Sequence, residues 1–128
     1  MIHSFKVAST LSAYRCVAIT GNNLVGYPGS AQALPIGITK NTVDDTNQSI
    51  PVAGVGERAM LYFNDTAASA DYVASDTSGR GVKWTPGANT TSAFTITSAF
   101  VGILCGPTIG LTGTIAEVYI VPGLSRGV

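Results

Sequence analysis

Short apolar segments separated by turn residues run along the whole chain. The segments are rich in Val, Ile, Thr, Tyr and Phe. Clusters of Gly, Pro, Asn, Asp and Ser interrupt them about every 8 to 12 residues, the spacing of strands in a sandwich or barrel rather than of βαβ units. We therefore predict strands over residues 14–20, 36–39, 50–55, 59–63, 81–85, 100–105 and 114–121.

The predicted strand at 114–121 shows the clearest alternation of side chains. Ile115, Glu117 and Tyr119 share one face, while Ala116 and Val118 share the other, because successive side chains of a strand point to opposite sides. We expect the face that carries Glu117 to be the more exposed one.

Two segments give weaker signals. Residues 66–72 resemble a helical stretch, and they form one or two helical turns or a loop. Residues 1–10 carry Ile2, Phe5 and Val7 without a strand pattern, and chain termini are loose unless something ties them down. We expect residues 1–10 to be an arm that orders on a partner. No internal repeat of fixed period is visible.

The chain has 128 residues, which is enough to bury about two-thirds of the surface that the unfolded chain exposes. We predict a single all-β domain over residues 1–128. Its architecture is a β-barrel or a β-sandwich of short antiparallel strands, with an N-terminal arm.

The charge content is low for a soluble domain. Hydrophobic residues make up 45% of the chain and charged residues only 11%, against about 25% charged in an ordinary domain. A surface built mainly from Thr, Ser, Asn, Ala and Gly indicates that partners cover much of it.

The same composition disfavours two classes of partner. Seven basic and seven acidic residues give no net charge and form no basic run that would follow a phosphate backbone, so we expect no nucleic-acid binding. The apolar stretches are shorter than the roughly 20 residues that span a bilayer, so we expect no membrane insertion. Residues 1–6 lack an apolar signal region, and we expect synthesis in the cytoplasm.

Few residues carry reactive chemistry. Cys16 and Cys105 lie in apolar strand-like runs, which favours buried free thiols over a disulfide. With His3 as the single histidine, we expect no structural zinc. Asp76-Thr77-Ser78-Gly79 is similar to the Asp-Thr/Ser-Gly loop of aspartic proteases, but Ser78 intervenes and a second copy is missing, so we predict a surface turn. We expect no catalytic residue and no cofactor, and therefore no enzyme.

Trp84 is the single tryptophan and lies beside a turn. It is a candidate aromatic anchor of an interface, and the alternative is packing in the core or against a loop.

The succession of apolar runs and glycines resembles the capsid decoration, or cement, proteins of tailed bacteriophages. The resemblance covers most of the chain. It rests on residues 11–17 (LSAYRCV), 34–39 (LPIGIT), 51–59 (PVAGVGERA), 78–81 (SGRG), 99–103 (AFVGI) and 116–122 (AEVYIVP). The sequence departs from the family over residues 86–97 and 40–49, where loops are longer.

This resemblance implies a β-rich, often trimeric protein on the outer surface of the mature head, between capsomers. The major capsid protein and further copies of the chain, as a homotrimer, are then its partners. The candidate capsid or trimer contacts are Ile2, Phe5, Lys6 and Trp84. The alternative is a virion binding module, either the base of a head fibre or a domain that binds host-surface carbohydrate.

Overall fold

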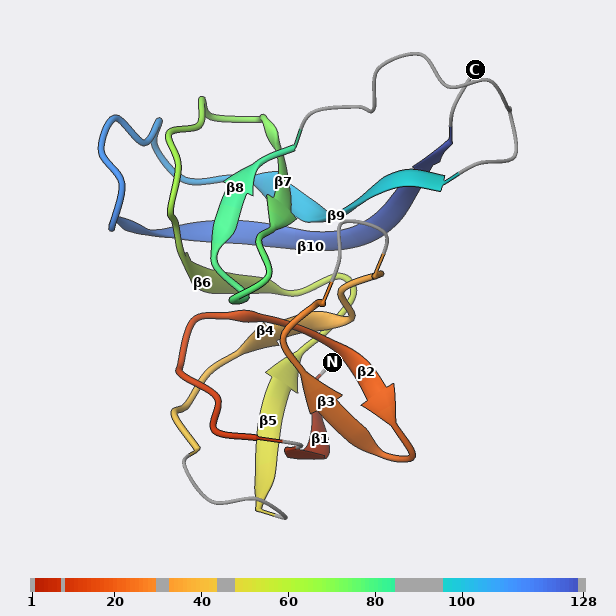
Figure 1. Ribbon diagram of the computed structural model, residues 1–128. Helices are drawn as coiled ribbons and strands as arrows, with labels where there is room; N and C mark the ends of the chain where they lie inside the picture. Colours follow the sequence, from red (N-terminus) through yellow and green to blue (C-terminus); the bar gives the residue numbers. More distant parts are fainter. Residues whose placement is uncertain (1, 8, 30–32, 44–47, 85–95, 127–128) are drawn as a thin grey trace.

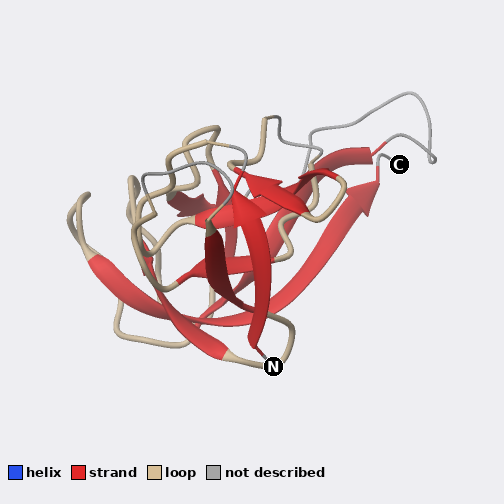
Figure 2. Ribbon diagram, turned by 90° about the horizontal axis from the view of Figure 1, so that it is seen from below, coloured by secondary structure: helices blue, strands red, loops and turns tan. Residues whose placement is uncertain are grey.

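The computed structural model describes residues 2–7, 9–29, 33–43, 48–84 and 96–126. These residues form ten strands joined by loops, and the described part contains no helix (Figure 2). The strands are β1 (Ile2–Val7), β2 (Cys16–Gly21), β3 (Leu24–Gly26), β4 (Gly37–Thr39), β5 (Ser49–Ala53), β6 (Arg58–Tyr62), β7 (Tyr72–Ser75), β8 (Gly81–Lys83), β9 (Ile96–Leu104) and β10 (Ile115–Arg126). The prediction of a small all-β fold is confirmed.

The first five strands close into a barrel in the order β1-β3-β2-β4-β5 (Figure 1). The β1 and β3 strands pair in parallel, and the other pairs are antiparallel. Small branched side chains suit such an interior because they fill a narrow barrel without polar atoms. The buried cluster inside comprises Val7, Leu11, Val17, Val25, Val43, Ile50 and Val52.

The last five strands form a second sheet in the order β6-β10-β9-β7-β8. A parallel bridge between Phe63, directly after β6, and Gly81 of β8 links the two ends of this order. The β9 and β10 strands pair as far as Arg126 and Ile96, so they extend past β7 as a two-stranded ribbon (Figure 1). Their register shifts between Ile120 and Gly123, where a bulge bends the ribbon.

The two sheets repeat one topology. In each sheet, the first strand pairs in parallel with the third strand, and on its other side it pairs with the fifth. The second strand pairs with the third and with the fourth, and the fourth strand pairs with the fifth. We call β1–β5 the N-terminal repeat and β6–β10 the C-terminal repeat. Four residue pairings of the N-terminal repeat have a counterpart in the C-terminal repeat. Val7–Val25 corresponds to Phe63–Gly81, Leu11–Val43 to Ala67–Ile109, Cys16–Ile38 to Tyr72–Ile103, and Ala53–Ile38 to Tyr119–Ile103.

The correspondence extends to unusual backbone angles. A displacement of 56 positions relates the first three strands of the two repeats, and it takes Tyr14 to Ala70 and Asn23 to Gly79. All four residues have positive φ, at 62° and 75° for the first pair and 57° and 77° for the second. Because such angles are uncommon for residues with a side chain, their recurrence identifies the same turns in both repeats.

A glycine stands at the same crowded position in each repeat. A Cβ on Gly37 would overlap the backbone carbonyl oxygen of Ala53, and a Cβ on Gly102 would overlap that of Tyr119. Only glycine lets the fourth strand of each repeat approach the fifth so closely.

One apolar cluster joins the two repeats. It contains the interior of the C-terminal repeat together with Cys16, Ile38 and Ala53 of the N-terminal repeat, all three fully buried. Neighbouring residues such as Val17 and Val52 belong to the N-terminal barrel's own interior. Since side chains alternate along strands, Cys16, Ile38 and Ala53 point out of the first barrel and into the second repeat.

Polar contacts accompany this apolar junction. The N–H of Cys16 donates to the carbonyl of Gly79 over 2.7 Å, and the N–H of Tyr62 donates to the carbonyl of Tyr14 over 2.9 Å. The guanidinium of Arg15 lies 4.5 Å from the ring centre of Tyr62, a cation–π contact.

The strand predictions agree with the structure at seven of the elements and miss β1, β3 and β7. Residues 66–72 are a loop: Ala67 bridges Ile109, and β7 begins at Tyr72. Within the two loops that depart from the decoration proteins, residues 44–47 and 85–95 lie outside the described part of the chain.

The expectation of a loose arm over residues 1–10 is wrong for residues 2–7. Ile2–Val7 is β1, which pairs with β5 over five residues and with β3 on its other side. The segment lacks period-2 alternation because Phe5 and Val7 pack on the barrel core while its other positions are polar or lie at the strand end. Its hydrogen bonds tie the terminus down.

We expect deletion of residues 1–7 to abolish cooperative folding. The deletion leaves the edges of β3 and β5 open and removes Val7 from the barrel core. Circular dichroism during heating measures this: we expect the loss of a sharp unfolding transition, and an unchanged transition would contradict the role of β1.

We expect Gly37→Ala and Gly102→Ala each to lower the free energy of unfolding by about 3 kcal/mol or more, because the new methyl group has no space beside a backbone carbonyl. Gly110→Ala is the matched control, since nothing lies within 4 Å of a Cβ there. Chemical denaturation of the three variants tests the prediction, and equal stabilities would contradict the proposed close approach.

Candidate binding surface

The C-terminal repeat presents an apolar sheet face to solvent. Register places Met60 opposite Glu117, and Ile103 opposite both Tyr119 and Tyr72, so these side chains share one side of the sheet. We call this side the outer face, and it comprises Arg58, Met60, Tyr62, Tyr72, Ile103, Ile115, Glu117 and Tyr119.

Four large side chains of the outer face are substantially exposed. Met60 and Ile115 are each 42% exposed, Tyr72 is 43% exposed and Tyr119 is 39% exposed. The alternate residues Ala116 and Val118 are buried, which confirms the predicted alternation of this strand. Exposed apolar residues that gather on one face typically mark a site of interaction.

Charged groups at this face are paired but contribute little stability. Arg58 lies 3.6 Å from Glu117, and their side chains are 67% and 41% exposed. Exposed ion pairs of this kind are worth at most about 1 kcal/mol, so they leave the face largely neutral rather than charged.

Two shallow depressions border the outer face. One of about 370 Å³ is lined by Met60, Gly106, Pro107, Thr108, Ile109, Thr114, Ile115, Ala116 and Glu117. The other, of about 240 Å³, lies at the junction of the repeats and is lined by Tyr14, Thr39, Lys40, Arg58, Ala59, Met60 and Glu117. Each has a single carboxylate, Glu117, without a second acid, so the paired carboxylates of acid–base catalysis are absent from both depressions.

Three aromatic rings pack together where β7, β8 and β9 meet. Tyr72 lies 4.9 Å from Phe100 and 5.6 Å from Trp84, and Trp84 lies 5.1 Å from Phe100, measured between ring centres. Tilted and edge-on rings at these separations attract one another. Trp84 therefore packs against Tyr72 and Phe100 of its own sheet while it is only half-buried, and its role as an interface anchor stays a prediction.

The structure places the four predicted contact residues on different repeats. Ile2, Phe5 and Lys6 belong to β1; Phe5 packs partly against the barrel core, and Lys6 is exposed. Trp84 follows β8 in the other repeat. Met60 and Tyr72 were not predicted as surface residues, and alternation gave no signal for the short strand that carries Tyr72.

The two cysteines are free, as predicted, but only one is buried. Cys16 is enclosed at the junction, and burial raises the pKa of its thiol to about 12, although a hydrogen bond with Ser75 opposes the rise. Cys105 is exposed because β9 ends at Leu104, so the prediction of a buried thiol is wrong there. The pKa of Cys105 is raised chiefly by partial desolvation of its thiol and, as the next largest cause, by the carboxylate of Glu117.

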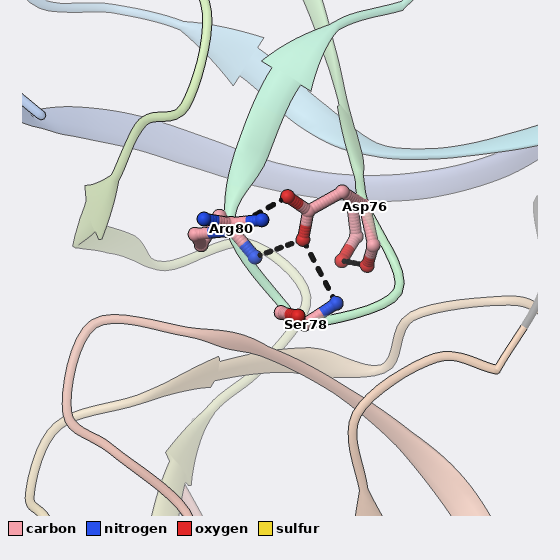
Figure 3. A network of polar contacts seen from close by, with 4 residues as sticks. Asp76, Ser78 and Arg80 are labelled. Atoms are coloured by element: carbon pink, nitrogen blue, oxygen red, sulfur yellow. Dashed lines mark hydrogen bonds and ion pairs between the residues drawn. The ribbon is translucent and has the colours of Figure 1, made fainter. Parts of the chain in front are cut away.

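The Asp76 loop is a tight turn between β7 and β8 (Figure 3). Asp76 Oδ1 accepts hydrogen bonds from the N–H groups of Ser78 and Arg80, over 2.9 and 2.8 Å, and Oδ2 accepts one from Arg80 Nε over 2.8 Å. The predicted surface turn is confirmed: the carboxylate organises the turn that contacts the N-terminal repeat through Gly79.

Within the described residues, no three His, Cys, Asp or Glu side chains gather in a way that could hold a metal ion. That part of the chain also has no helix long and apolar enough to cross a membrane.

A closed five-stranded barrel followed by a second five-stranded sheet of the same topology, with an exposed apolar face, defines an all-β protein of two tandem repeats. No family model matches the sequence, and no curated protein matches it. Among solved structures, the fold is similar to the N base of head fiber gp8.5 of bacteriophage phi29. The TM-score is 0.64 at 14% sequence identity, over 94% of this chain and 93% of that one.

We expect alkylation of Cys105 to be slow at pH 8 and to accelerate as the pH rises through its raised pKa, because the thiolate is the reactive form. Glu117→Gln removes an interaction that raises the pKa, so the rate at pH 8 should increase about two- to fivefold. Arg58→Gln should slow it, because Arg58 lowers this pKa.

Mass spectrometry after timed iodoacetamide exposure measures these rates, with the buried Cys16 as an internal control that reacts only after unfolding. Equal rates in Glu117→Gln and the unchanged chain would contradict the assigned interaction.

Proposed function

We propose that this chain is a structural protein of a tailed-phage head that binds the outer surface of the capsid. The similarity to a head fiber base over nearly the whole of both chains carries the proposal. The sequence resemblance to capsid decoration proteins supports it independently, because it points to the same location. The proposed partner is the major capsid protein.

The surface chemistry supports a binding role rather than catalysis. The chain has few charges and no net charge, and the C-terminal repeat exposes large apolar side chains over one sheet face. Such surfaces suit close packing against another protein. A protein that binds only the expanded shell stabilises it by mass action, since its binding free energy adds to that state alone.

Two roles are consistent with attachment to a head. The structural neighbour favours the base of a head fibre, in which the fold anchors a projecting element. The neutral surface and the sequence resemblance favour a cement role, in which a homotrimer bridges neighbouring capsid subunits over the whole shell. In both, the two repeats provide the capsid-binding part.

The number of copies per particle tests the proposal and separates the roles. We expect quantitative mass spectrometry of purified virions, from the phage that encodes the chain, to detect it in every preparation. A ratio of about one chain per major capsid protein establishes the cement role, because closed shells repeat one contact throughout. A small number of copies establishes the fibre-base role, and absence from virions would contradict both.

A further inference from the structure

The internal repeat allows the outer face of the C-terminal repeat to be compared with the equivalent face of the N-terminal repeat. Cys16, Ile38 and Ala53 of the N-terminal repeat correspond to Tyr72, Ile103 and Tyr119 of the C-terminal repeat, since each set occupies the same register positions. The first set is fully buried against the next repeat, whereas Tyr72 and Tyr119 of the second set are about two-fifths exposed. The same face is therefore covered in one repeat and open in the other.

Ile38 and Ala53 of the first set pack in the interior cluster of the C-terminal repeat, and Cys16 lies in addition against a turn of that repeat. The N–H of Cys16 binds the carbonyl of Gly79, the Cys16 thiol contacts Ser75, and the Tyr27 ring lies so close to Gly79 that a Cβ there would clash with it. The outward face of the N-terminal repeat thus contacts, at its Cys16 end, the end of β7 and the turn to β8, residues 75–79, which Asp76 organises (Figure 3).

The N-terminal repeat carries the equivalent turn, and it is open. Residues 19–23 comprise the end of β2 and the turn to β3, and they correspond to residues 75–79; Asn23 and Gly79 both have positive φ, at 57° and 77°. All five of these residues are exposed, and Ile19 is a large hydrophobic side chain with 56% exposure. Ile19 stands where Ser75 stands in the C-terminal repeat.

We propose that a second copy of this chain docks head to tail, with the turn at residues 19–23 of one copy seated on Tyr72, Ile103 and Tyr119 of the next. The contact continues the one that already joins the two repeats, as expected when stacked repeats each bury a face on their neighbour. Tyr72 on Ile19 replaces the smaller Cys16–Ser75 contact, so aromatic and aliphatic side chains cover each other.

The two surfaces differ, so the contact is heterologous and closes into a ring or extends as a chain. This inference deepens the self-association that the proposed function includes. The contact is inferred from the repeat alone and is tested on the isolated chain, so a failure of this contact is distinguishable from a failure to bind capsids.

The test compares the full chain with Ile19→Asp and Tyr72→Asp by light scattering over a concentration series. We expect concentration-dependent association of the unchanged chain, weakened about tenfold or more by either variant. Leu111→Asp is the matched control: Leu111 is 77% exposed and belongs to neither surface. Because Tyr72 also packs on Trp84 and Phe100, Tyr119→Asp provides a second variant of the same face, and thermal melting checks that each variant folds.

Mixing the variants distinguishes head-to-tail docking from a symmetric contact. Ile19→Asp keeps an intact face and Tyr72→Asp keeps an intact turn, so the mixture should form a dimer of one of each while the separate variants stay monomeric. Four results would overturn the inference: a monomeric unchanged chain, association insensitive to either surface, association sensitive to only one, or a mixture that stays monomeric.

Discussion

The fold depends on the burial of the N-terminal barrel's outward face against the interior of the C-terminal repeat. A five-stranded barrel of about 50 residues has too small an interior to be very stable alone. By sending Cys16, Ile38 and Ala53 into the neighbouring core, the chain extends the apolar cluster of the C-terminal repeat onto the outward face of the N-terminal barrel, whose own interior is a separate cluster. The polar contacts of Arg15 and of the Asp76 turn then fix how the two repeats meet.

Alternation and turn residues were sufficient to predict an all-β fold, and they predicted which face of residues 115–119 is exposed. They could not show the repeat. Over residues 2–27 and 58–83 only Thr10 and Thr66, Val17 and Val73, and Ala18 and Ala74 are identical. The displacement between equivalent residues is 56 positions through the third strand of each repeat and 65 positions at the fourth strand, so the repeat has no fixed period in the sequence. Strand β1 was missed for a related reason: pairing on both sides, rather than an alternating pattern, holds it in the barrel.

The candidate site was harder to predict than the fold. Lys6 and Trp84 were chosen by residue type, but β1 and β8 belong to different sheets. The outer face forms only when β6, β7, β9 and β10 assemble, since Met60, Tyr72, Ile103 and Tyr119 lie far apart in the sequence. A binding surface made by register across four strands leaves no local motif. For the same reason, the comparison with a solved structure rests on the whole fold rather than on any short run of residues.

The proposed location on a phage particle is tested most directly by a cryo-electron microscopy map of virions from the phage proposed to encode the chain. The account predicts density outside the capsid shell that fits both five-stranded repeats and contacts the major capsid protein. Density for the chain inside the head, or a shell whose outer surface carries no density that fits the two repeats, would contradict it.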